Sequence, residues 1–77
     1  MFEYIHHVAY VVSDMDDAVR IFRETFELEL SDRRVIEGER SAEMAAFRCG
    51  PTVIELLRPI NHPALAQFLE DHGPGLH

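Results

Sequence analysis

The segment from Tyr4 to Val12 constrains the fold most, because it places apolar side chains on both faces of one predicted strand. Aromatic and β-branched residues dominate it, and side chains alternate between the two faces of a strand. One face carries Ile5, His7, Ala9 and Val11, and the other carries Tyr4, His6, Val8, Tyr10 and Val12. A sheet built on this strand therefore needs cover on both of its sides.

A helix is predicted directly after this strand. Ser13 precedes a helical repeat of apolar residues, and Asp16 at the third following position gives an acidic variant of the capping box, so we expect the helix to begin there. Its apolar stripe consists of Met15, Ala18, Val19, Phe22 and Phe26. Charged residues fall largely between these positions, so the stripe is expected to pack on a sheet.

Three further strands are predicted after the helix. Residues 29–36 alternate poorly and are highly charged, which is typical of a short edge strand. A turn signal follows, after which residues 41–49 and 52–58 flank Gly50-Pro51 and indicate a hairpin. The chain therefore continues as three consecutive strands.

A short helix is expected to close the chain. It should begin near Asn61, present Leu65, Phe68 and Leu69, and end at residues 72–75. The predicted fold is α+β, a single βαβββ module over residues 1–77 with a short C-terminal helix. One main helix covers one face of such a sheet, so the other face needs another molecule or another module.

Length, composition and charge indicate how the chain is stabilised, which partners it can bind and where it is located. A chain of 77 residues has little stability margin of its own, and a lone Cys49 without any CxxC pair provides neither a disulfide nor a zinc cluster, so oligomerisation is the remaining source of stability. The net charge of -7 argues against nucleic acid as a partner. Without a leader-like N-terminus or a long apolar run, we expect a cytoplasmic protein with no membrane partner.

Two residues on apolar strand faces are candidates for chemistry. His7 alone is more typical of a hydrogen-bonded core histidine than of a metal ligand. Glu55, however, lies between Val53 and Leu57 on an otherwise apolar strand, where a carboxylate without a partner is costly to bury. An arginine from a neighbouring strand would satisfy Glu55, but a divalent metal shared with His7 accounts for both residues.

The chain resembles the vicinal oxygen chelate superfamily, which includes glyoxalases, bleomycin resistance proteins and dioxygenases, in the stretches IHHVAYVVSDMDDAVRIFRETFEL, VIELLRP and FLEDHGPGLH. Within it, methylmalonyl-CoA epimerases are the most similar. The resemblance implies a glyoxalase-like fold with the fourth strand beside the first. It also implies that residues 1–77 are half of a two-module domain, ending where the second module would begin. His7 and Glu55 are then two metal ligands of a set that two modules complete.

The same resemblance implies a function. We expect a metal-dependent epimerase or racemase, an isomerase that removes the proton α to an acyl-CoA thioester such as methylmalonyl-CoA and passes through a metal-stabilised enolate. The metal is Co, Mn, Mg, Ni or Zn, and the partner is a second module or a second copy in a homodimer. The alternatives are a glyoxalase I-like lyase, a metal-free antibiotic-binding protein of the same fold, or an inactive isolated module.

Glu43 is a conditional third candidate. Epimerases that resemble this chain have a Glu at the matching place in the third strand, which implies an acid/base role. If the hairpin loop has two residues, Cys49 pairs with Thr52 and Glu43 falls on the face opposite Glu55. A three-residue loop or a bulge instead puts both carboxylates on one face. The alternative to an acid/base role is that Glu43 is a solvated strand carboxylate near Arg40 or Arg58.

Overall fold

A computed structural model describes residues 6–76 of the chain and confirms the predicted order of elements. The elements are β1 (His6–Val11), α1 (Met15–Glu24), β2 (Glu29–Ile36), β3 (Ser41–Cys49), β4 (Thr52–Asn61), α2 (Pro63–His72) and β5 (Gly75–Leu76). Tyr4 and Ile5, with which the first strand was expected to begin, lie outside the described residues. The short strand β5 was not predicted, because two residues are too few to show an alternating pattern.

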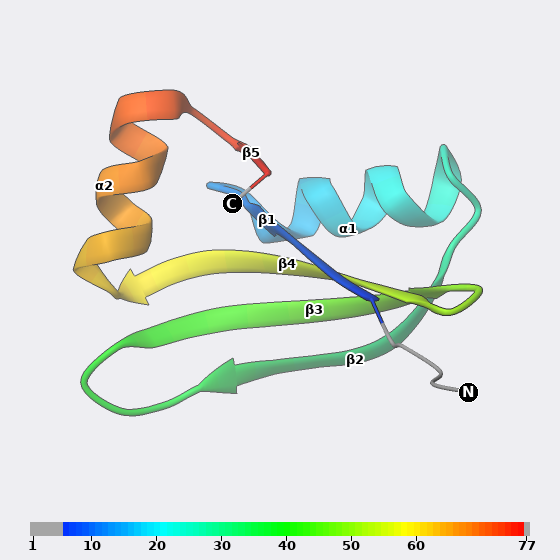
Figure 1. Ribbon diagram of the computed structural model, residues 1–77, viewed down its shortest axis with the longest axis horizontal. Coiled ribbons are helices and arrows are strands. Elements are labelled where there is room, and N and C mark those ends of the chain that lie inside the picture. The colour runs from blue at the N-terminus through cyan, green and yellow to red at the C-terminus, as the bar shows by residue number, and fades with distance from the viewer. Residues whose placement is uncertain (1–5, 77) are drawn as a thin grey trace.

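The described strands form one mixed sheet in the order β2-β3-β4-β1-β5 (Figure 1). The fourth strand lies beside the first and parallel to it, as expected, while β2, β3 and β4 are antiparallel neighbours. The charged strand β2 occupies an edge, as its sequence indicated. The parallel pair β1–β4 brings together residues that are 46 positions apart, such as His7 and Val53.

The strand β4 continues past the predicted end at Arg58 and reaches Asn61. Pro59 follows the predicted end, and proline has no N–H to donate to a ladder. Here it pairs with Ala42 next to a bulge between Ser41 and Ala42. Bulges are positions at which a sheet tolerates proline.

Helix α1 begins one residue later than predicted, so the expectation that Ser13 is its cap was wrong. Asp14 is the N-cap, with extended backbone angles, and its side chain accepts a hydrogen bond of 3.0 Å from the backbone N–H of Asp17. Aspartate and serine cap helices comparably well, so the sequence offered two adjacent candidates. The backbone conformation at Asp14 decides between them.

One face of the sheet is covered by α1, which encloses the larger core. Met15 and Val19 from the helix are buried against strand residues on this face. The strand members of this cluster are Ala45, Phe47 and Leu56, all fully buried. Phe26, the last residue of the predicted stripe, is 57% exposed because the helix has already ended, and its ring packs on Phe22 instead.

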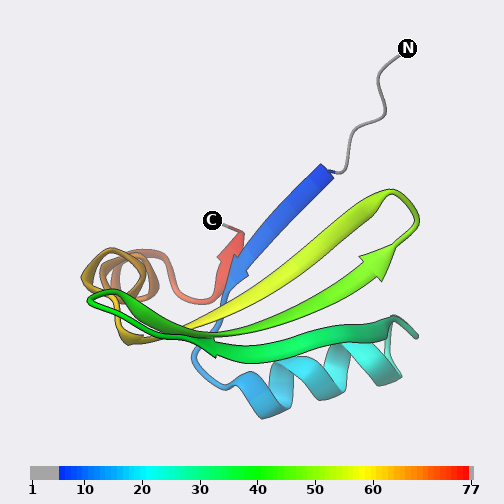
Figure 2. The ribbon, with the colours of Figure 1, turned by 90° about the horizontal axis from the view of Figure 1, so that it is seen from below.

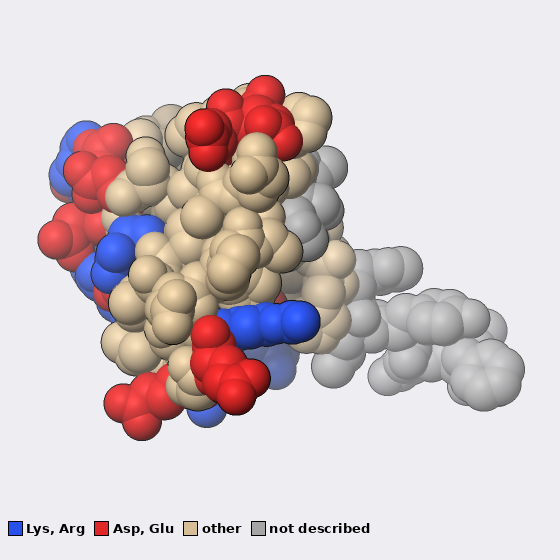
Figure 3. Space-filling view, turned by 90° about the vertical axis from the view of Figure 1, so that its left-hand side faces the viewer, with Lys and Arg blue, Asp and Glu red and all other residues tan. Residues whose placement is uncertain are grey.

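Within residues 6–76, α2 covers one end of the second face. His62 caps this helix by accepting a hydrogen bond from the N–H of Leu65, and Leu65 is buried with Val11 and Ala42. Seen from this end, a largely uncharged surface lies between acidic groups above and below it (Figure 3). The helices α1 and α2 have ten residues each, and no helix in the described part of the chain is long and apolar enough to cross a membrane.

No helix of the described part of the chain lies over the rest of the second face. Viewed along the sheet, the strands curve away from α1, and α2 and β5 lie together at one end of the opposite side (Figure 2). We call this uncovered part the open face. By strand register it is formed by His7, Ala9, Ala46, Arg48, Val53 and Glu55.

Candidate functional site

His7 and Glu55 meet on the open face. Nδ1 of His7 lies 3.3 Å from Oε1 of Glu55, although the two residues are 48 positions apart. The parallel register places His7 opposite Val53 and Ala9 opposite Glu55, so the two polar side chains come from adjacent rows of one face. In the tautomer that carries its proton on Nδ1, His7 donates to the Glu55 carboxylate.

Space remains above this pair because its neighbours are small. Glu55 is flanked in the sheet by Ala9 on β1 and Ala46 on β3. The His7 side chain is 59% exposed and that of Glu55 is 32% exposed. A nitrogen and a carboxylate oxygen are therefore both accessible from the open side.

The donor set of the pair fits a divalent metal ion. His7 Nδ1 and Glu55 Oε1 would hold such an ion in the tautomer that leaves Nδ1 unprotonated, because a metal binds the lone pair of the ring nitrogen. The observed distance between His7 Nδ1 and Glu55 Oε1 is 3.3 Å. Histidine nitrogen with carboxylate oxygen suits Zn, Co, Ni or Mn. Within residues 6–76 no group of three or more His, Cys, Asp or Glu side chains converges, so this pair supplies at most part of a coordination shell.

Glu43 lies on the other face of the sheet. The hairpin has the two-residue loop, with Cys49 opposite Thr52, so Glu43 pairs with Arg58 in the register and faces α1. An acid/base role beside Glu55 required both carboxylates on one face of the sheet, and this register places them on opposite faces. A change of one residue in register reverses the face of every side chain in a strand.

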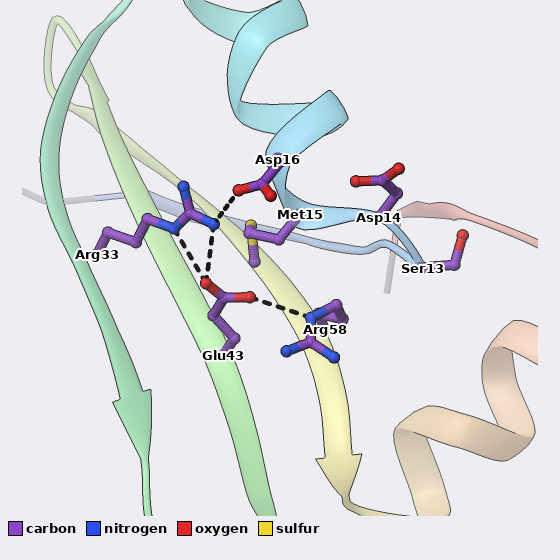
Figure 4. Close-up of a pocket in the computed structure, with 7 residues that line it drawn as sticks. All are labelled: Ser13, Asp14, Met15, Asp16, Arg33, Glu43 and Arg58. Atoms are coloured by element: carbon purple, nitrogen blue, oxygen red, sulfur yellow. Dashed lines mark hydrogen bonds and ion pairs between the residues drawn. The ribbon is translucent and has the colours of Figure 1, made fainter.

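Arginines surround the Glu43 carboxylate on the α1 side (Figure 4). Arg33 donates from Nε to its Oε2 at 3.0 Å, and Arg58 donates from Nε to its Oε1 at 3.0 Å. Arg33 also donates to Asp16 at 2.6 Å, which ties the edge strand β2 to the first turn of α1. Arg58 was expected as a neighbour of Glu43, whereas Arg33 was missed because the bulge between Leu30 and Asp32 breaks the alternation of β2.

The protonation of Glu43 follows from these contacts. Burial by itself raises its pKa, but hydrogen bonds from Arg58 and Arg33 and the charges of both guanidinium groups outweigh burial, so the pKa of Glu43 is lowered. Hydrogen bonds to Asp16 and Glu43 in turn raise the pKa of Arg33. Glu43 is thus held as a carboxylate whose two oxygens already have cationic partners.

A cavity of about 350 Å³ lies beside this cluster. Its lining residues are Ser13, Asp14, Met15, Asp16, Arg33, Glu43 and Arg58. Asp16, Arg33, Glu43 and Arg58 bind one another beside the first turn of α1 (Figure 4). By strand register, Glu43 and this cavity lie on the opposite side of the sheet from Glu55. We therefore place the candidate site at the open face and not at this cavity.

Comparison with known families agrees with this architecture. Residues 4–77 match the Glyoxalase/Bleomycin resistance protein/Dioxygenase superfamily. The chain belongs to this superfamily. The match spans nearly the whole chain and confirms the resemblance seen in the sequence. No match to a curated protein was found.

Solved structures share the fold of this superfamily member. A hypothetical protein from Bacillus halodurans C-125 superimposes with a TM-score of 0.84 at 24% identity, covering 95% of this chain and 53% of that protein. The methylmalonyl-CoA epimerase from Mycobacterium tuberculosis gives a TM-score of 0.84 at 21% identity, covering 100% and 55%. A methylmalonyl-CoA epimerase in complex with methylmalonyl-CoA and NH4+ gives 0.84 at 23%, covering 100% and 58%. The chain thus spans little more than half the length of these structures.

Proposed function

We propose that this chain is one module of a divalent-metal enzyme that acts on an acyl thioester such as methylmalonyl-CoA and moves the proton α to the thioester carbonyl. The observation that carries the proposal is the contact between His7 Nδ1 and Glu55 Oε1 on the open face. Further support comes from the fold shared with methylmalonyl-CoA epimerases, one of which was solved with methylmalonyl-CoA.

The reaction needs positive charge near the substrate carbonyl. Removing a proton α to a thioester leaves negative charge on the carbonyl oxygen, and a bound divalent ion supplies the charge that stabilises it. His7 and Glu55 would hold that ion. The residues that flank Glu55 in the sheet, Ala9 and Ala46, are small and leave room for a substrate beside it.

The second half of the site comes from a second module in this proposal. One chain offers two ligands, and structural or catalytic metal sites in proteins usually have at least three. Two copies related by a twofold axis would place two His7 and two Glu55 around one ion. Because Glu43 faces α1 in each copy, the group that moves the substrate proton in this proposal is a residue other than Glu43.

Metal content and oligomeric mass, measured on the same sample, test this proposal. We expect a dimer with about half a metal ion per chain, because one ion is shared between two pairs of ligands. His7→Ala is expected to abolish metal uptake and to weaken the dimer formed with metal. His72→Ala is the matched control, since His72 is an exposed histidine at the end of α2. Unchanged metal content in His7→Ala would refute the metal site.

Activity separates the enzymatic alternatives. Exchange of the α proton of methylmalonyl-CoA with deuterium from solvent, dependent on added metal, supports the epimerase. Turnover of a glutathione hemithioacetal would instead assign the chain to glyoxalase-like lyases. If a metal-loaded dimer catalysed neither reaction, both activities would be excluded for this chain.

A further inference from the structure

No strand of residues 6–76 pairs with the outer side of β2. This strand ends the sheet on the side away from β5, so the backbone N–H and C=O groups on its outer side face no other strand of the described chain (Figure 1). Every residue of β2 except Leu30 is exposed, and Val35 and Ile36 add apolar surface at 51% and 43% exposure. A free edge of this kind is a template for another strand.

Two charges of opposite sign lie on one face of this edge. Asp32 and Arg34 pair in the register with Ala46 and Met44 of β3, so both project to the side of the open face. Nε of Arg34 lies 3.4 Å from Oδ2 of Asp32, and the two side chains remain 66% and 47% exposed. An exposed ion pair of this kind is weak. Both groups therefore stay accessible to a partner that arrives at the edge.

A second copy of β2 matches these charges in one register. Two antiparallel strands related by a twofold axis place residues of the same face opposite each other, so the axis passes between two identical residues. The regular part of β2, beyond its bulge, is residues 32–36. With the axis at Arg33, Asp32 of each copy stands opposite Arg34 of the other. An axis at any other residue of this stretch leaves Asp32 without an arginine of β2 opposite it.

The central residue of this register already has acidic partners. Two Arg33 side chains would stand opposite each other, and like charges in that position are unfavourable. Arg33, however, binds Asp16 at 2.6 Å and Glu43 at 3.0 Å on the α1 side of the sheet. Its charge is therefore compensated within its own copy. Charged residues usually protect an edge because an arriving strand does not match them, whereas a second copy of β2 does.

We propose that two copies of this chain associate through β2, antiparallel about a twofold axis at Arg33, with ion pairs between Asp32 and Arg34 in both directions. The contact needs no metal, and β3 separates it from the strands β4 and β1 that carry Glu55 and His7. One pair of short strands is a small interface, and each copy has a net charge of -7. The association is therefore weak, with a Kd between about 0.1 and 1 mM.

Sedimentation velocity of the full chain from about 10 μM to 1 mM, with metal and with EDTA, measures this association. The weight-average mass of wild type should rise with concentration under both conditions. Asp32→Arg and Arg34→Asp each replace two attractions by two repulsions and should weaken the association about tenfold. An equimolar mixture of these two variants should associate again, because the two arginines of one chain then face the two aspartates of the other. The double variant should also associate, since it exchanges the two charges.

Glu70→Arg is the matched control. It changes the net charge as Asp32→Arg does, at an exposed position of α2, and should leave the association unchanged. A wild-type mass that stays constant over the whole range, single variants that associate like wild type, or a mixture that stays apart would each refute the pairing. A rise in mass that EDTA abolishes would assign the association to the metal site instead. Metal content, measured on the same proteins, reports separately on the proposed function, because the charge variants should leave it unchanged.

Discussion

The two faces of the sheet each carry a carboxylate among apolar side chains, and the two carboxylates have opposite surroundings. Glu43, on the face covered by α1, has a side chain 16% exposed and binds Arg33 and Arg58. Glu55, on the open face, is 32% exposed and contacts His7. A carboxylate with two cationic partners is a structural group, whereas one with a single histidine retains oxygen lone pairs for a ligand.

The faces also differ in how much they contribute to stability. The α1 side contains the buried cluster around Phe47 and Leu56, while the open face has small or polar residues at its centre. Burial of large apolar side chains is the main source of folding free energy. Substitutions on the α1 face should therefore change the free energy of unfolding, and substitutions on the open face should change ligand binding.

The largest effect is expected from Phe47→Ala. Phe47 is fully buried, and deleting a buried phenylalanine ring costs about 3–5 kcal/mol in free energy of unfolding. Urea denaturation followed by circular dichroism measures the change. Phe26→Ala is the matched control, because Phe26 is 57% exposed and its loss should cost less than about 1 kcal/mol. Equal losses in the two variants would contradict the division between the faces.

A smaller effect separates the two carboxylates. Glu43→Gln should lower the free energy of unfolding by about 1–2 kcal/mol, because two charge-assisted hydrogen bonds become neutral ones at arginines that water partly screens. Glu55→Gln should change it by less than about 0.5 kcal/mol but should remove metal uptake. The pair of variants is measured by urea titration and by element analysis. The reverse pattern would show that the open face carries the structural carboxylate.

The smallest effect concerns pH. Arginine contacts lower the pKa of Glu43 in the folded chain, so the folded state binds this proton more weakly than the unfolded state does. The resulting stability is fully present above the unfolded-state pKa of about 4.3 and is lost as the pH falls through the lower folded-state pKa. Urea midpoints measured over this acidic range should fall less steeply in Glu43→Gln than in wild type. Identical slopes would mean that Glu43 has no such linkage.

Much of the fold was readable from local sequence signals. Aromatic and β-branched residues indicated β1, and the Gly50-Pro51 turn signal indicated the hairpin. The helical repeat from Met15 to Phe22 defined the buried side of α1, and high charge marked β2 as an edge. These signals work because each depends on residues close together in the chain. The N-cap of α1 at Asp14 rather than Ser13 and the exposure of Phe26 depended on backbone conformation at the helix ends, which sequence spacing does not specify.

Identifying the candidate site required both the sequence and the tertiary structure. Sequence alone marked His7 and Glu55 as polar residues on apolar strand faces, because a buried charge without a partner is unfavourable wherever the strand lies. Only the tertiary structure decided that they touch, since their contact requires β1 to lie parallel to β4, and α1, β2 and β3 separate these strands along the chain. The hairpin register likewise decided that Glu43 faces α1, because one residue of loop length sets the face of every side chain that follows.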